Sequence, residues 1–169
     1  MDYKLDVVNI RLVKEPSLYS KEEVTTPESV VALMAKELAQ YDREVMCVLN
    51  LKSNMQVINM NIVSMGTINS SLVSARELFK SSILSNAASM ILLHNHPSGS
   101  ITPSKQDQIV TKKLVSCGSL MDIPILDHII VGGENGKLFS FKEQNLLETG
   151  ALTFEPSEIK KPLEKKKCR

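Results

Sequence analysis

An apolar run that ends in two histidines constrains the fold of this chain more than any other stretch. Residues 90–93 are Met-Ile-Leu-Leu, and His94 and His96 follow them, one residue apart. The run predicts a buried strand, and Pro97 and Gly99 predict that this strand ends in a loop. Residues i and i+2 of a strand point to the same side, so both imidazoles can face one point. The sequence therefore predicts a buried strand whose end presents two imidazoles together.

A carboxylate follows this strand end in the sequence. Asp107 lies eleven residues after His96. Two imidazoles and one carboxylate are a common ligand set for a catalytic zinc ion, whose fourth position holds water. Another interpretation needs no metal: Pro103, Ser104 and Asp107 have the spacing of a helix start, with Ser104 as the N-cap of a capping box. Both interpretations can hold together, since a capped helix start would keep Asp107 at a fixed place beside the strand end.

The wider pattern resembles a known protein family. Residues 94–97, His-Asn-His-Pro, are followed after six residues by Ser104-x-x-Asp107, and this arrangement resembles the JAMM motif of the JAB/MPN metallopeptidases. The sequences that flank this motif, Asn-Ala-Ala at 86–88 and Leu-Asp-His at 126–128, are similar to those of the bacterial RadC branch of that family.

The resemblance runs from about Val24 to Glu143. It implies an α/β (α+β) fold in which helices flank a mixed β-sheet, the JAB/MPN or cytidine-deaminase-like fold. We divide the chain into an N-terminal extension at 1–23, a RadC-like JAB/MPN domain at 24–150 and a basic, flexible tail at 151–169. RadC proteins usually carry an N-terminal helix-hairpin-helix segment, and we expect none here because the residues before the domain leave no room for one.

The resemblance also implies roles for individual residues. It implies a zinc ion held by His94, His96 and Asp107. It implies a catalytic general base at Glu44, directly before a predicted strand, and a hydroxyl at Ser104 that helps to hold the oxyanion. From the residues alone, Glu44 can also be read as a solvated acid at a strand start.

Two other acidic positions compete for roles at this site. Glu77 is the alternative general base, but Ser74 three residues before it predicts a capping box that explains Glu77 more simply. Asp127 and His128 lie on a later predicted strand, where a carboxylate can orient a metal-bound imidazole. A satisfied pair in the core is an equally good interpretation, so we do not expect His128 to be a ligand.

Hydrophobic periodicity predicts the order helix, two strands, helix, strand, helix, two strands. The helices are expected from Pro27 to about Gln40, after Ser74, and from Ser104 with Gly118 just past the end. In the last helix we expect Ile109, Val110, Leu114 and Val115 to form the apolar face. The strands are expected at Glu44–Leu51, Met55–Met65, Ala87–His94, Pro124–Val131 and Lys137–Phe141, with a short edge strand at Tyr3–Lys14.

Charge and cysteine content limit the function classes. Lys and Arg number 20 and Asp and Glu number 19, so the net charge of +1 gives no sign of a nucleic-acid surface. Cys47, Cys117 and Cys168 have no Cys-x-x-Cys spacing and are typical of reduced thiols in a cytoplasmic protein. The first residues hold no apolar run of signal length, and no stretch approaches ~18 apolar residues, so we expect no membrane span.

We therefore expect a zinc-dependent hydrolase of the JAMM type that cuts an amide or isopeptide bond in a peptide or protein substrate. The alternative is a DNA-repair-associated or protein-interaction module that binds metal without turning over peptides. A third interpretation, a metal-dependent nuclease, is weaker because nucleases more often gather several carboxylates around two metal ions.

Overall fold

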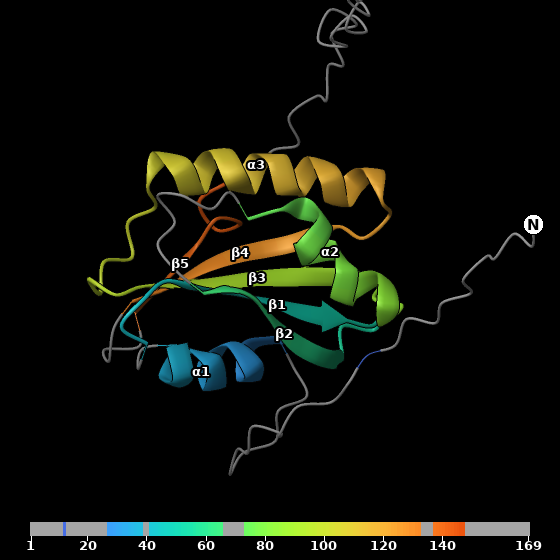
Figure 1. The fold of residues 1–169 in the computed structure, drawn as a ribbon, viewed down its shortest axis with the longest axis horizontal. Helices are drawn as coiled ribbons and strands as arrows, with labels where there is room; N and C mark the ends of the chain where they lie inside the picture. The colour runs from blue at the N-terminus through green and yellow to red at the C-terminus, as the bar shows by residue number, and fades with distance from the viewer. Residues whose placement is uncertain (1–11, 13–26, 39–40, 66–72, 133–136, 148–169) are drawn as a thin grey trace, which may run out of the picture.

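The computed structural model describes residue 12 and residues 27–38, 41–65, 73–132 and 137–147. Within these ranges three helices and five strands follow one another in the predicted order (Figure 1). They are α1 (Pro27–Leu38), β1 (Val45–Leu51), β2 (Val57–Met65), α2 (Ala75–Leu84), β3 (Ser89–His96), α3 (Lys105–Leu120), β4 (Ile125–Gly132) and β5 (Lys137–Ser140).

The strands form one mixed sheet in the order β2-β1-β3-β4-β5. β1 is antiparallel to both β2 and β3, β3 is parallel to β4, and β4 is antiparallel to β5. A parallel pair requires a crossover connection, and α3 supplies it between β3 and β4. The loop that follows β3 and the first turn of α3 therefore both lie at the end of the central strand.

The helices cover both faces of the sheet, with α1 on one face and α2 and α3 on the other (Figure 1). Side chains of the central strands alternate between two hydrophobic clusters, as strand geometry requires. On β1, Val45, Cys47 and Leu49 pack in the cluster that includes α1, whereas Met46 and Val48 pack in the cluster that includes α2 and α3. All seven residues of β1 are buried, which explains why this strand is an almost continuous apolar run.

The expected mixed sheet flanked by helices is confirmed. The hairpin of β1 and β2 and the start of α1 at Pro27 are also as predicted.

The last helix differs from its prediction in two respects. α3 continues to Leu120, so Gly118 lies inside the helix and does not follow its end. A Cβ at Gly118 would come within 2.7 Å of the Ile123 carbonyl oxygen, so glycine is present for close packing rather than to end the helix. Ile109 was expected on the apolar face but is 61% exposed, because α3 turns only Val110, Leu114 and their neighbours toward the sheet.

The capping box predicted at the start of α2 is not formed. Ser74 occupies the N-cap position, but its side chain makes no capping hydrogen bond. The Glu77 carboxylate instead accepts a hydrogen bond from the Lys80 ammonium, one helical turn farther along. Opposite charges at this spacing attract each other across the helix surface, and this pairing competes with the cap.

Several expectations lie outside the described residues. These are the edge strand at 3–14, the extension at 1–23 and the tail at 151–169. Among the residues that are described, no helix is both long and apolar enough to cross a membrane.

Candidate metal centre

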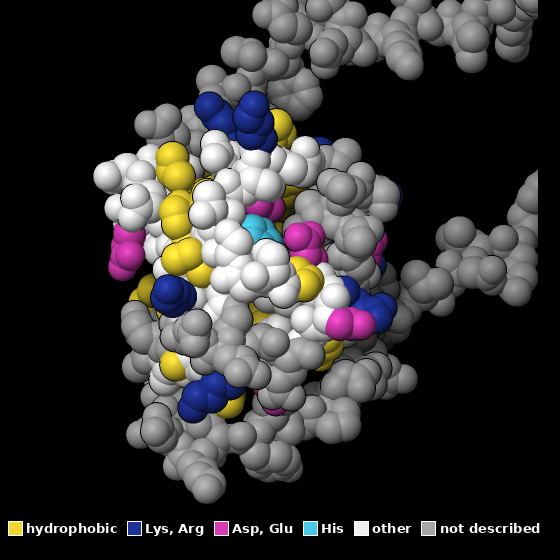
Figure 2. All heavy atoms as spheres, turned by 90° about the vertical axis from the view of Figure 1, so that its left-hand side faces the viewer, with side chains coloured by type: hydrophobic (Ala, Val, Ile, Leu, Met, Phe, Trp, Pro, Cys, Tyr) yellow, Lys and Arg dark blue, Asp and Glu magenta, His cyan; other side chains and the backbone are white. Residues whose placement is uncertain are grey.

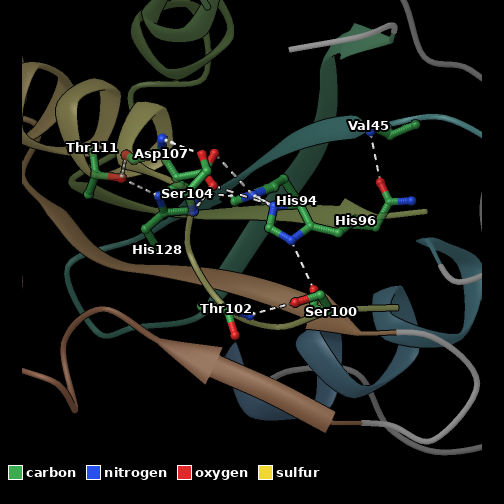
Figure 3. A network of polar contacts seen from close by, with 10 residues as sticks. Val45, His94, His96, Ser100, Thr102, Ser104, Asp107, Thr111 and His128 are labelled. Atoms are coloured by element: carbon green, nitrogen blue, oxygen red, sulfur yellow. Dashed lines mark hydrogen bonds and ion pairs between the residues drawn. The ribbon is translucent and has the colours of Figure 1, made fainter. Parts of the chain in front are cut away.

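Two adjoining elements bring the predicted ligands together. His94 and His96 are the last inward-facing residues of β3, and Asp107 is in the first turn of α3. Their side chains point toward one another at the end of the central strand (Figure 3). One ligand atom from each residue lies within 4.8 Å of the other two, which is close enough for a single metal ion to bind all three.

The distances among these side chains are close to those between the ligands of a tetrahedral site. The two Nε2 atoms of His94 and His96 are 3.1 Å apart, the His94 Nε2 is 3.5 Å from Asp107 Oδ1, and the His96 Nε2 is 3.4 Å from Asp107 Oδ2. Ligands ~2.0–2.2 Å from a tetrahedral zinc would be separated by roughly 3.3–3.5 Å. Two imidazole lone pairs at such a distance repel each other unless a proton or a cation lies between them. The geometry and the donor types therefore fit a zinc ion.

Burial and hydrogen bonding shift the protonation of all three groups. Burial lowers the pKa of His94 to about 4, so this imidazole is neutral near pH 7. The hydrogen bond with Asp107 raises the pKa of His96 against the opposing effect of burial. Burial alone would raise the pKa of Asp107, but hydrogen bonds with His96 and Ser104 outweigh it and hold that pKa below its ordinary value. The carboxylate is thus ionised, as a metal ligand must be.

Ser104 forms the predicted capping box with Asp107. The Ser104 Oγ accepts a hydrogen bond from the backbone N–H of Asp107 at 3.1 Å, and the Ser104 N–H donates to Asp107 Oδ2 at 2.7 Å. The structural interpretation of this pair is therefore confirmed, and it leaves the metal interpretation open. The cap orients the carboxylate toward the histidines, and it uses only a lone pair of the Ser104 hydroxyl.

Glu44 lies across the same site, directly before β1. It is half-buried and lines a pocket together with His96, Ser104 and Asp107. Its charge contributes to raising the pKa of His96, so the carboxylate is within electrostatic reach of the ligand cluster. Glu77, the alternative base, is exposed on α2 and is not among the pocket residues.

The pocket has a volume of about 660 Å³ and opens to solvent where histidine and acidic side chains meet at the surface (Figure 2). Most of its lining residues are of polar or charged types, with hydroxyls from the loop after β3 and charges from the segment before β1. The lining residues are Asp42, Arg43, Glu44, His96, Pro97, Ser98, Ser100, Thr102, Ser104, Lys105, Gln106 and Asp107.

Asn95 positions the backbone on both sides of Glu44. Its Oδ1 accepts a hydrogen bond from the Val45 N–H at 2.7 Å, and its Nδ2 donates to the Arg43 carbonyl at 3.1 Å. Strand alternation predicts that Asn95 points away from His94 and His96, and its bonds to the segment before β1 agree.

His128 lies directly behind His94, on the neighbouring strand β4. Its Nε2 is 2.7 Å from Nδ1 of His94, and its Nδ1 is 2.6 Å from the Thr111 hydroxyl (Figure 3). His128 is fully buried and is not part of the cluster of His94, His96 and Asp107. The contact between His128 and His94 was missed, because it depends on the parallel pairing of β3 with β4.

Asp127 does not serve the metal site. Its Oδ1 accepts hydrogen bonds from the backbone N–H groups of His128 and Lys142, and its Oδ2 accepts one from the Ser140 hydroxyl. The carboxylate thus ties β4 to β5 and the turn after it. Thr111, and not Asp127, contacts the ring of His128. A signal for it was present, since Thr111 follows Asp107 by four residues and so shares its face of the helix.

Comparison with known proteins assigns the chain to a family. A model of the RadC-like JAB domain matches residues 24–146. A UPF0758 protein of Desulforamulus reducens is 45% identical over 124 residues, which cover 73% of this chain and 54% of the relative. A UPF0758 protein of Moorella thermoacetica is 43% identical over 128 residues, which cover 76% of this chain and 55% of the relative. Another, of Methanosarcina acetivorans, is 41% identical over 135 residues, which cover 80% of this chain and 56% of the relative. The chain thus spans about half the length of the curated relatives it matches. It belongs to the RadC-like JAB domain family.

Proposed function

We propose that this domain is a zinc-dependent hydrolase that cleaves an amide or isopeptide bond in a peptide or protein substrate. One observation carries the proposal: a two-histidine, one-aspartate cluster with metal-site distances shares a pocket with a carboxylate that is not part of the cluster. Hydrolysis by metal-activated water requires such a separate acid–base group. Membership of the JAB domain family supports the same chemistry.

Zinc is the metal that the donor set fits best. His94 and His96 offer imidazole nitrogens and Asp107 offers one carboxylate, a combination typical of catalytic zinc sites with an open fourth position. When bound, zinc would supply a hydroxide at neutral pH by lowering the pKa of a water molecule to ~7.

Glu44 is the proposed general base and acid. Its carboxylate oxygen accepts a proton from water in the pocket and later donates that proton to the nitrogen of the leaving amine. Ser104 is proposed to donate a hydrogen bond from its hydroxyl to the oxygen of the substrate carbonyl as negative charge develops there. This role is compatible with the cap, because the cap occupies a lone pair of Oγ and not the proton.

Metal content tests the ligands. Full-length protein purified without added metal is expected to contain one zinc ion per chain by elemental analysis. His96→Ala is expected to lose most of this zinc while keeping the fold by circular dichroism, since His96 is only partly buried. A His96→Ala protein with full zinc content would refute the assignment.

Hydrolysis tests the base. Glu44→Gln is expected to keep its zinc but to lose ~10²–10⁴-fold in rate, because glutamine cannot accept and return a proton. The substrate is a mixture of unfolded proteins and isopeptide-linked peptides, with new termini identified by mass spectrometry. Glu77→Gln is the matched control, since Glu77 lies on α2 outside the pocket, and full activity is expected. Zinc binding without any cleavage by the unaltered protein would favour a metal-binding interaction module instead.

A further inference from the structure

The third histidine of the chain has no part in the proposed reaction, although it touches a proposed ligand. His128 is fully buried, and the rings of His94 and His128 have centroids 4.8 Å apart. Behind His128 lies the hydroxyl of Thr111, which is also buried and is 2.6 Å from the carbonyl oxygen of Asp107. A continuous line of polar atoms therefore runs from α3 through β4 to the metal-facing side of β3 (Figure 3).

The proton positions along this line can be assigned by starting from Thr111. A backbone carbonyl can only accept, so the Thr111 hydroxyl donates its single proton to Asp107 O. The contact of 2.6 Å between Thr111 Oγ1 and His128 Nδ1 then needs a proton on the nitrogen. A neutral imidazole carries one proton, so Nε2 of His128 is an acceptor.

The same reasoning assigns the proton of His94. The 2.7 Å contact between His94 Nδ1 and His128 Nε2 requires His94 to carry its proton on Nδ1. Nε2 of His94 is left with a lone pair, and this is the atom that faces His96 and Asp107. If both hydrogen bonds of His128 ran in the opposite direction, His94 would carry its proton on Nε2. That hydrogen would point into the ligand cluster and exclude a cation.

We propose that Thr111 and His128 are positioning residues that hold the proton of His94 on Nδ1 and thereby keep its Nε2 free to bind a metal. The consequence for metal binding rests on the proposed function, whereas the proton position does not. His96 reaches the same tautomer by a separate route, since its Nδ1 lies 2.9 Å from the carbonyl of Ser100, which can only accept. The Nδ1 of His94 is instead hydrogen-bonded to His128, so its proton position depends on His128 and, behind it, on Thr111.

Nitrogen-15 NMR of the metal-free, full-length protein tests the proton positions directly. The chain has 3 histidines, so their spectra are easily assigned. About two pH units above the ordinary histidine pKa of ~6.5, the rings of His94 and His128 are expected in the Nδ1–H form. Thr111→Val removes the hydroxyl while keeping the side-chain shape, and it is expected to move the proton of His94 wholly or partly to Nε2. Thr111→Ser restores a hydroxyl and should restore the original spectrum.

Zinc affinity, measured by competition with a chromophoric chelator, is the second readout. Partners that orient a metal-bound histidine are typically worth ~10–100-fold in affinity, and Thr111→Val should lose an amount in this range. Ser116→Ala is the matched control, because the Ser116 hydroxyl donates to the Lys112 carbonyl with the same four-residue spacing on the same helix. This variant should bind zinc as the unaltered protein does.

Two results would overturn the inference. One is an Nε2–H form of His94 in the unaltered, metal-free protein. The other is a Thr111→Val protein that keeps both the Nδ1–H spectrum and the original zinc affinity. Failure of the unaltered protein to bind zinc would instead refute the proposed function. In that case the spectra of the unaltered protein and of Thr111→Val still decide whether Thr111 and His128 set the proton position of His94.

Discussion

Asn95 offers a test of the site that needs no substrate. Its side chain is 2% exposed and bridges two strands, with one hydrogen bond on each side of Glu44. Asn95→Ala removes both bonds without touching a proposed ligand. The Val45 N–H then loses its hydrogen-bond partner at the start of β1, where Val45 is 0% exposed.

The cost can be worked out bond by bond. An orphaned buried N–H costs ~1–3 kcal/mol, and the lost bond to the Arg43 carbonyl adds the net worth of an ordinary hydrogen bond, about 0.5–1.5 kcal/mol. The free energy of unfolding should therefore fall by roughly 2–4 kcal/mol. For a chain of 169 residues each kcal/mol shifts Tm by ~2–4 °C, so a decrease of roughly 4–16 °C is expected.

Urea unfolding and thermal melting of the metal-free protein measure this change. Asn61→Ala is the matched control, since Asn61 is an exposed asparagine on β2 and its loss should have little effect. Asn95→Asp separates the two bonds: it keeps an acceptor for the Val45 N–H but places a second acceptor against the Arg43 carbonyl, and it should also be destabilised. An Asn95→Ala protein as stable as the Asn61→Ala control would show that the two bonds do not hold this segment.

Two further predictions concern the rest of the domain. Gly118→Ala should lower the free energy of unfolding by ~1–3 kcal/mol, because a Cβ would lie 2.7 Å from the Ile123 carbonyl oxygen. Helix propensity alone would make alanine stabilising at this position. Urea unfolding shows whether the variant is less or more stable than the unaltered protein. In metal-free protein, burial lowers the pKa of His94 to about 4 and the pKa of His128 well below its ordinary value. The unfolded chain binds these protons below pH ~6.5 and the folded protein does not, so stability should decrease as pH falls from ~6.5 toward 4, by at most ~1.4 kcal/mol per pH unit for each histidine. The raised pKa of His96 adds no slope there, because His96 is protonated in both states below pH ~6.5. A flat unfolding free energy over this range, measured in urea, would contradict the burial of the two rings.

Local signals were sufficient to predict the elements that carry the ligands. The capping box of Ser104 and Asp107 is formed by residues three apart, so its outcome depends little on the rest of the fold. The strand that carries the histidines was predicted from an apolar run and a proline that follows it, although β3 ends at His96 and not at the expected His94. By contrast, the box at Ser74 failed because Lys80, one turn away, competed for the Glu77 carboxylate.

The residues that support the site could not be predicted in the same way. His128 meets His94 only because β4 lies parallel to β3, and Asn95 meets Val45 only because β1 lies antiparallel on the other side. Both pairings join residues far apart in the sequence, and a shift of one residue in register would turn each side chain to the opposite face. Strand order and register therefore decide these contacts, and neither can be read from residue spacing.

Each proposed ligand is hydrogen-bonded to a different part of the protein. His94 is hydrogen-bonded to His128 on β4, His96 to the Ser100 carbonyl in the loop, and Asp107 to Ser104 at the start of α3. A site whose side chains are already fixed loses little conformational entropy when an ion binds. We therefore expect a bound ion to stabilise the folded state through mass action, by RT ln(1 + [metal]/Kd). We also expect the core to form without it, in contrast to small zinc folds, in which metal binding and folding are one event.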